Sequence, residues 1–136
     1  MPIYANGRDT SLRNLGRGTG SGDVTSKTLF LQAVAVDARR PCFFTENGIN
    51  VSRLVGSIRG SGSPSVTWTL RFGPARNGVG TEVVEGGTTT NDEAVGSSDI
   101  MFSNATVPAN SFVWLHVTAV GGTVDELTVT VIPELV

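Results

Sequence analysis

The sequence predicts an all-β protein, an antiparallel β-sandwich or jelly roll of about eight strands with an extended N-terminal arm. Short apolar runs with period-2 alternation recur about every ten residues, a spacing typical of such folds. Turn-forming residues separate these runs, and Gly alone supplies 17 of the 136 residues. The body shows no convincing helical pattern. A hydrophobic content of 39% suits the core of a single domain.

The first 27 residues differ from the rest, so we expect an arm with a Gly-rich tether over 1–27 and a β-sandwich over 28–136. Residues 1–27 hold four basic and two acidic groups, whereas the remainder holds six basic and ten acidic groups. The segment is either a frayed terminus or an arm that orders on a partner, with apolar residues entering pockets and arginines pairing with carboxylates. The candidate binding residues are Ile3, Tyr4, Arg8, Leu12, Arg13, Leu15 and Arg17.

The first half of the body predicts four strands. Residues 28–38 and 42–45 are extended and apolar, and Asn47-Gly48 after them predicts a hairpin turn. Residues 50–59 form the next strand, with a possible bulge at Gly56. After the loop 60–64, residues 65–72 alternate cleanly. The inward set there is Val66, Trp68, Leu70 and Phe72.

The second half predicts shorter strands and a long hairpin. Residues 81–85 form a short edge strand, 86–98 a polar loop with a brief edge strand, and 99–102 a further strand. Residues 112–120 are apolar or bulky on both sides, as in a central strand covered on both faces. Gly121-Gly122 then breaks this strand, and residues 127–132 return as its hairpin partner.

Catalytic motifs are absent from the sequence. Cys42 is the single cysteine and is expected to be a small buried hydrophobe, and the one histidine, His116, is expected to be a hydrogen-bonded interior or interface side chain. The acidic pairs Asp92-Glu93 and Asp125-Glu126 fit solvated loops better than a calcium site. We therefore expect no enzyme activity, no cofactor and no metal site.

Charge and hydropathy exclude further classes of function. The net charge of −2 and the content of 16% charged residues do not favour nucleic acid or an anionic membrane as a partner. No apolar run reaches the roughly 20 residues of a membrane span, and no signal peptide is recognisable. The chain is therefore expected to fold in a cytosol.

Several stretches resemble small virion proteins of tailed bacteriophages. The resemblance rests on residues 63–68 with 72–76, on 105–115 and on 118–129, and it spans about residues 45–132. It implies a compact β-sandwich that serves as a head decoration (cement) protein, a head fibre or a tail accessory protein, often as a homotrimer. The short arm, without a long fibre segment, favours the decoration protein.

The resemblance implies a place and a partner. The protein would bind the major capsid protein on the outer capsid surface of the virion, after assembly in the host cytoplasm. The alternative is a tail or head-fibre module that binds a host surface glycan or receptor. That alternative predicts exposed aromatic residues in loops, whereas the two tryptophans fall in predicted strands.

Overall fold

The computed structural model describes residues 25–135, and in this part the chain forms eight β-strands and no helix. All strand pairings are antiparallel, which confirms the predicted all-β fold. Residues 1–24, the greater part of the predicted arm, lie outside the described residues. The strands are β2 (Lys27–Gln32), β3 (Cys42–Thr45), β4 (Ile49–Gly73), β5 (Thr81–Glu82), β6 (Thr88–Thr90), β7 (Ser97–Asp99), β8 (Thr106–Val107) and β9 (Ser111–Leu135).

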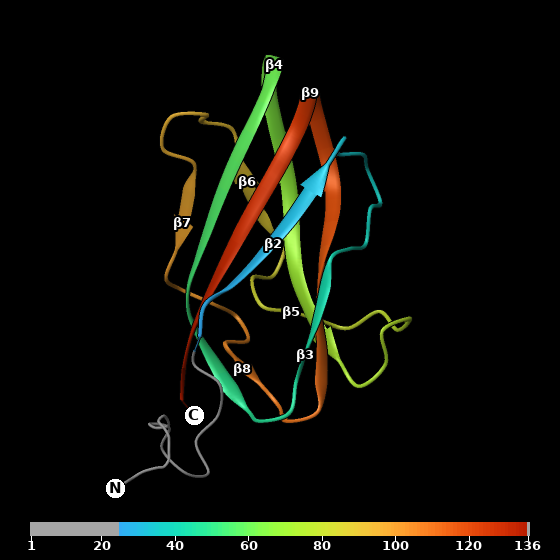
Figure 1. The fold of residues 1–136 in the computed structure, drawn as a ribbon, viewed down its shortest axis with the longest axis vertical. Coiled ribbons are helices and arrows are strands. Elements are labelled where there is room, and N and C mark those ends of the chain that lie inside the picture. Colours follow the sequence, from blue (N-terminus) through green and yellow to red (C-terminus); the bar gives the residue numbers. More distant parts are fainter. Residues whose placement is uncertain (1–24, 136) are drawn as a thin grey trace, which may run out of the picture.

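Two long strands, β4 and β9, build the body of the molecule. They pair along their whole length, and both bend sharply at the same end (Figure 1). Residues 49–61 of β4 pair with 123–135 of β9, and 65–73 of β4 pair with 112–121 of β9. Positive φ angles of 68° at Gly62 and 62° at Gly122 turn the chain at the bend. The paired strands therefore fold over into two layers.

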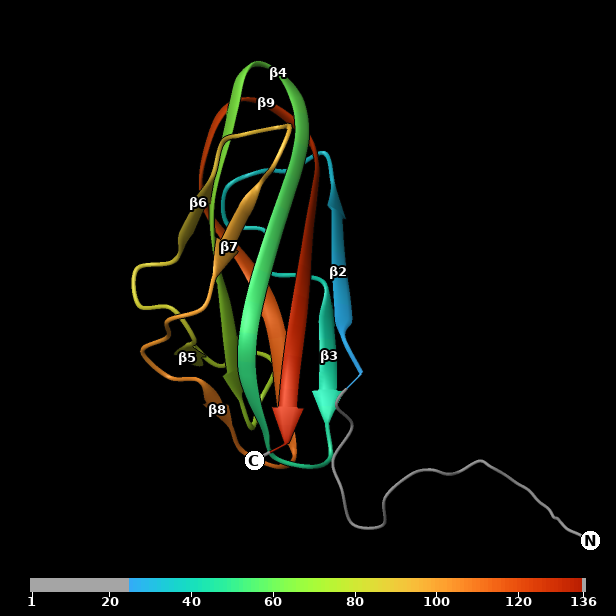
Figure 2. The same cartoon turned by 90° about the vertical axis from the view of Figure 1, so that its left-hand side faces the viewer.

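The shorter strands widen each layer. β2 joins the second half of β9, and β7 and β8 join the first half of β4. In the other layer β3 joins the first half of β9, and β5 and β6 join the second half of β4. This arrangement of two packed antiparallel sheets is consistent with the predicted β-sandwich. In Figure 2 the strands β5 to β8 lie on one flank of β4 and β9, and β2 and β3 lie on the other flank.

Neither predicted hairpin forms as expected. Strand β3 precedes the Asn47-Gly48 turn, yet it pairs with β9 and not with β4. The runs 112–120 and 127–132 are the two halves of β9, and each half pairs with β4 in a different sheet. The turn residues mark where the chain changes direction, but the choice of partner is made by non-local packing.

The core lies between the two sheets. Trp68 is fully buried there, and its indole Nε1 donates a hydrogen bond of 2.9 Å to Thr90 Oγ1. A Cβ added at Gly56 would lie 2.7 Å from Ser97 Oγ and from Thr90 Oγ1, so the glycine permits a close approach and does not mark a bulge. The predicted inward set of 65–72 is confirmed. Other large core side chains are Leu54, Ile58, Leu70, Leu115 and Leu127.

Three predicted strands are shorter than expected, and the one predicted over 81–85 ends at Glu82. β2 ends at Gln32, and positive φ angles at Ala33 and Asp37 take the chain across to the other sheet. There the linking segment 33–41 runs beside β9, where the amide of Asp37 bonds the carbonyl of Val117 at 2.8 Å. The strand predicted over 99–102 ends at Asp99, and the chain continues as an irregular segment to β8.

Candidate interaction surfaces

The predicted binding residues of the arm lie outside the described residues, so their role stays a prediction. They are Ile3, Tyr4, Arg8, Leu12, Arg13, Leu15 and Arg17. The first strand of the described residues is β2. Lys27 opens β2 at the end of the sandwich opposite the bend, close to the end of β9 (Figure 1). A hollow of about 190 Å³ lies there, lined by Lys27, Phe43, Phe44, Thr45, Glu46, Asn47, Ile49 and Pro133.

The outer face of the sheet that contains β3 is covered by loops, and we call it the covered face. Its central side chain is Trp114, which is fully buried although it points away from the core between the sheets. A Cβ added at Gly80 would lie 2.6 Å from the Trp114 ring, and the Arg76 guanidinium lies 5.4 Å from the ring centroid. Loop 73–80 therefore buries this tryptophan.

His116 lies beside Trp114 on the covered face, within a short polar network. Arg71 Nε donates to His116 Nδ1 at 3.3 Å, and His116 Nε2 lies 3.5 Å from Asp37 Oδ1. Arg71 also pairs with Glu82 at 3.6 Å. This geometry suits a neutral imidazole with its proton on Nε2. Burial lowers the pKa of His116 below 6.5, and the positive charges of Arg39 and Arg71 add to this effect, while Asp37 opposes it.

Hydrogen bonding under the loops is incomplete. Trp114 Nε1 and Thr69 Oγ1 are buried without a hydrogen-bond partner among residues 25–135. Thr69 of β4 lies opposite His116 of β9 in the strand register, so its side chain points to the same face as His116. Thr69 Oγ1 and Trp114 Nε1 therefore both belong to the covered face. Each unsatisfied polar group costs free energy on burial. The covered face is therefore packed less favourably than the core, where the Trp68 indole is satisfied.

The other sheet has an outer face without a cover, which we call the open face. Its outward residues come from β2, β9 and the first half of β4, and none of them is buried. Four of them are small hydroxyl side chains, three are longer amide or charged side chains and three are apolar, including the exposed aromatic ring of Phe30 at the edge. The open face consists mainly of Thr28, Phe30, Gln32, Val55, Ser57, Arg59, Glu126, Thr128, Thr130 and Ile132.

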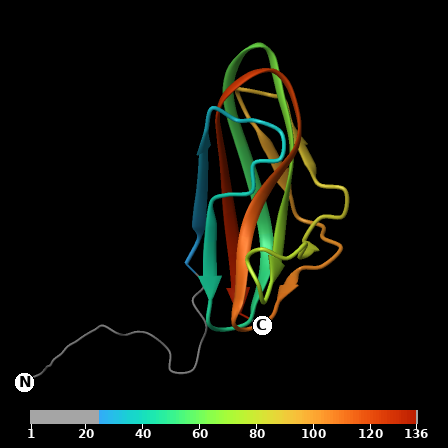
Figure 3. The ribbon, with the colours of Figure 1, turned by 90° about the vertical axis from the view of Figure 1, so that its right-hand side faces the viewer.

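Two narrow sides connect these faces. In Figure 2 the β2/β3 side, residues 27–48, lies on the right and the β5–β8 side, residues 81–107, lies on the left, and in Figure 3 the two sides are exchanged. Cys42 lies on the β2/β3 side and is exposed, so the prediction of a buried cysteine was wrong. Most exposed large hydrophobic residues of the described part lie on these sides. They are Phe30, Val36 and Phe44 on the first, and Val95, Ile100 and Met101 on the second.

The two sides differ in charge. Residues 81–107 hold five acidic side chains and no basic one, whereas 27–48 hold three basic and two acidic side chains. Arg76 from loop 73–80 adds a further positive charge to the β2/β3 side, because its guanidinium donates to the carbonyl of Arg39. This asymmetry between the two sides was not predicted from the sequence. A count of charge by segment would have found it. The acidic residues are Glu82, Glu85, Asp92, Glu93 and Asp99.

Neither a metal-ion site nor a membrane-spanning helix is found among the described residues. Within residues 25–135, no group of three or more His, Cys, Asp or Glu side chains is placed to hold a metal ion. The same residues contain no helix with the length and apolar character of a membrane span. No protein-family model, curated protein or solved structure matches the chain significantly.

Proposed function

We propose that this chain is a structural protein of a tailed-bacteriophage virion, a decoration (cement) protein that binds the outer surface of the major capsid protein shell and stabilises the head. The role is non-enzymatic, and the protein acts as a homo-oligomer, a trimer by the resemblance described above. The observation that carries the proposal is the start of β2 at one end of a stiff sandwich. An arm that precedes β2 leaves the body from that end.

The end that carries Lys27 would face the capsid shell. It holds the hollow of about 190 Å³ with aromatic and aliphatic walls from Phe43, Phe44 and Ile49. The arm would cross neighbouring capsid subunits from this end, while the bend of β4 and β9 points away from the shell. Because β4 and β9 run continuously through both sheets, the two sheets are joined to each other by the same pair of strands. Contacts made only in the expanded shell stabilise that shell by mass action.

Deletion of residues 1–20 tests the proposal. We expect the truncated protein to lose co-sedimentation with expanded capsids of the phage that encodes it. Its far-ultraviolet circular dichroism and urea midpoint should match those of the full chain, because the described strands begin only at Lys27. Undiminished capsid binding by the truncated protein would remove the arm from the mechanism.

Two variants distinguish the positive charges of the arm from positive charges elsewhere on the protein. Arg8, Arg13 and Arg17 changed to Gln remove three positive charges from the arm, whereas Arg53 and Arg59 changed to Gln remove two from exposed positions of β4. We expect weaker capsid binding, with a smaller salt dependence, only in the arm variant. Equal losses in both variants would point to a nonspecific charge effect.

The alternative function, recognition of a host glycan by a tail or head-fibre module, has one observation in its favour. Phe30 is 47% exposed and lines a hollow of about 370 Å³ together with Gln32 and Arg40. An aromatic ring flanked by amide and guanidinium groups suits a sugar. Binding on a glycan array that is lost in Phe30→Ala would favour this function over capsid decoration.

A further inference from the structure

We propose that copies of this chain associate side by side, with the β2/β3 side of one copy against the β5–β8 side of the next. This inference rests on one element of the proposed function, the statement that the protein acts as a homo-oligomer. It adds which surfaces join the copies. The partner is a second copy of the same chain, and the argument comes from charge, exposed apolar residues and the position of the two sides.

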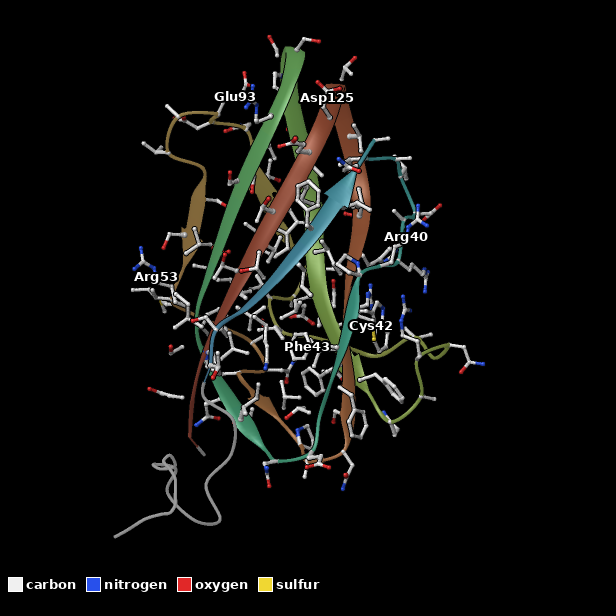
Figure 4. The ribbon with its side chains drawn as sticks, viewed as in Figure 1. Arg40, Cys42, Phe43, Arg53, Glu93 and Asp125 are labelled. Carbon is white, nitrogen blue, oxygen red and sulfur yellow. The ribbon has the colours of Figure 1, made fainter. Side chains whose placement is uncertain are left out.

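The first observation is charge complementarity. The β5–β8 side carries five carboxylates from residues 81–107, and one arginine from β4 reaches it, since Arg53 Nε donates to Ser98 Oγ at 2.9 Å. One of the carboxylates, Glu82, is paired with Arg71 inside the same chain. On the β2/β3 side, Arg39 and Arg40 are both exposed. In Figure 4 Arg40 lies on the β3 flank of the sandwich, and Glu93 lies on the opposite flank. Opposite charges of this kind favour contact between unlike sides and disfavour contact between like sides.

The second observation is the position of the exposed hydrophobic residues. Phe44 is 47% exposed on β3, and its ring makes an edge contact with Phe112 at a centroid distance of 5.0 Å. On the opposite side, Ile100 and Met101 are 71% and 84% exposed in the segment between β7 and β8. Apolar residues flanked by charge are the usual composition of a protein–protein contact. Both sides therefore have what a subunit contact requires.

The third observation is topological. β2 and β3 pair only with β9, whereas β5 to β8 pair only with β4, so the two sides are the opposite flanks of both sheets. A contact between opposite flanks is head-to-tail, and copies joined in this way form a closed ring when the rotation between neighbours closes. A contact between two β2/β3 sides would instead bring Arg39 and Arg40 of one copy against the same residues of another.

Charge reversal tests the pairing. One variant carries Arg39→Glu and Arg40→Glu, a second carries Glu85→Lys and Glu93→Lys, and a third carries all four changes. We expect wild type to sediment as an oligomer. Each single-side variant should associate roughly a hundredfold more weakly, because like charges then face each other. The four-fold variant should regain association, since the opposite charges are restored in exchanged positions.

Failure of the four-fold variant to regain association, with all variants folded by circular dichroism, would overturn the proposed pairing. A wild-type protein that remains monomeric at its highest soluble concentration would overturn it as well. Cys42 supplies an independent readout because it is the single cysteine and is exposed on the β2/β3 side. Its alkylation rate should fall as the concentration of wild type rises, but should stay constant in the single-side variants.

The capsid assay keeps the two proposals distinguishable. If wild type forms the oligomer and the four-fold variant regains it, but neither binds capsids, the side-by-side contact stands and the decoration role fails. If the single-side variants bind capsids as well as wild type and wild type is monomeric, the decoration role stands and the side-by-side contact fails.

Discussion

The two tryptophans are both fully buried, yet they are buried by different means. Trp68 lies between the sheets, and its indole N–H is bonded to Thr90. Trp114 lies on the covered face beneath loop 73–80, and its indole N–H has no partner among residues 25–135. The same degree of burial therefore reflects a core in one case and a loop closed over a strand in the other. We expect their contributions to stability to differ.

The outer faces of the two sheets differ in a related way. The covered face holds Trp114, His116 and Arg71 under loops, whereas the open face presents a mixture of hydroxyl, charged and apolar side chains without a cover. Loops from both ends of the strands supply the cover on one sheet only. Stability is thus concentrated between the sheets, followed by the covered face and then the open face. We expect the loss of stability on substitution to decrease in the same order.

The largest effect is expected for the tryptophans themselves. Trp68→Ala should lower the free energy of unfolding by about 3–5 kcal/mol, because it leaves a cavity between two rigid sheets. Trp114→Ala should cost less, since loop 73–80 can collapse into the space and an unsatisfied N–H is removed. Urea unfolding followed by circular dichroism measures both. An equal or larger cost for Trp114→Ala would contradict the distinction between core and covered face.

Substitution of two glycines by alanine tests the same difference between core and covered face, because it adds volume instead of removing it. Gly56→Ala adds a methyl group 2.7 Å from two hydroxyl oxygens and 3.1 Å from the Trp68 ring, so it should cost about 1–3 kcal/mol. At Gly73 the nearest atom to an added Cβ lies 3.6 Å away, and the Trp114 ring lies at 3.8 Å. Gly73→Ala should therefore change the free energy of unfolding by less than about 1 kcal/mol. A reversed order in urea unfolding would refute this account of the packing.

The covered face should also make stability depend on pH. Because the folded-state pKa of His116 is lowered, the unfolded chain binds more protons below pH 6.5. This component of stability is present above pH 6.5 and is lost as the pH falls towards the folded-state pKa. Urea midpoints between about pH 5 and pH 7 measure the slope.

His116→Gln is the control for this slope, since it removes the titrating ring but retains a polar side chain of similar length. We expect a flatter dependence of the urea midpoint on pH in this variant. An unchanged slope would mean that other groups, and not His116, cause the acid sensitivity.

The smallest effect is expected on the open face. Thr128→Ala and Ser57→Ala replace small side chains that point to solvent, and each should change the free energy of unfolding by less than about 0.5 kcal/mol. Losses above 1 kcal/mol in urea unfolding would show that the open face contributes to the fold of the single chain.

The sequence predicted where the strands lie along the chain better than it predicted which strands pair. The bounds 42–45 agree with β3, and the alternation over 65–72 correctly identified the inward side of β4. The pairing of β4 with β9 could not be predicted, because turn signals such as Asn47-Gly48 carry no information on partners that are 39 residues (Gly73 and Phe112) to 86 residues (Ile49 and Leu135) apart. Alternation also assigned Trp114 and Leu115 to opposite sides. With apolar residues on both sides, it did not show which side faced the core.

The candidate surfaces were less predictable than the fold. The exposure of Cys42 depends on its place at a sheet edge, where one flank has no neighbouring strand. The acidic run over 81–107 is visible in the sequence, but its position opposite Arg39 and Arg40 follows only from the sheet order. Ile100 and Met101 were assigned to a strand because they are apolar, whereas they lie exposed after β7 ends.

The most direct measurement is the number of copies bound per capsid shell, determined by quantitative gel analysis of sedimented shells before and after expansion. A decoration protein should saturate expanded shells at a fixed ratio to the major capsid protein, leave unexpanded shells bare, and raise the temperature at which expanded shells rupture. Equal binding to both kinds of shell, or no binding to either, would contradict the proposed role.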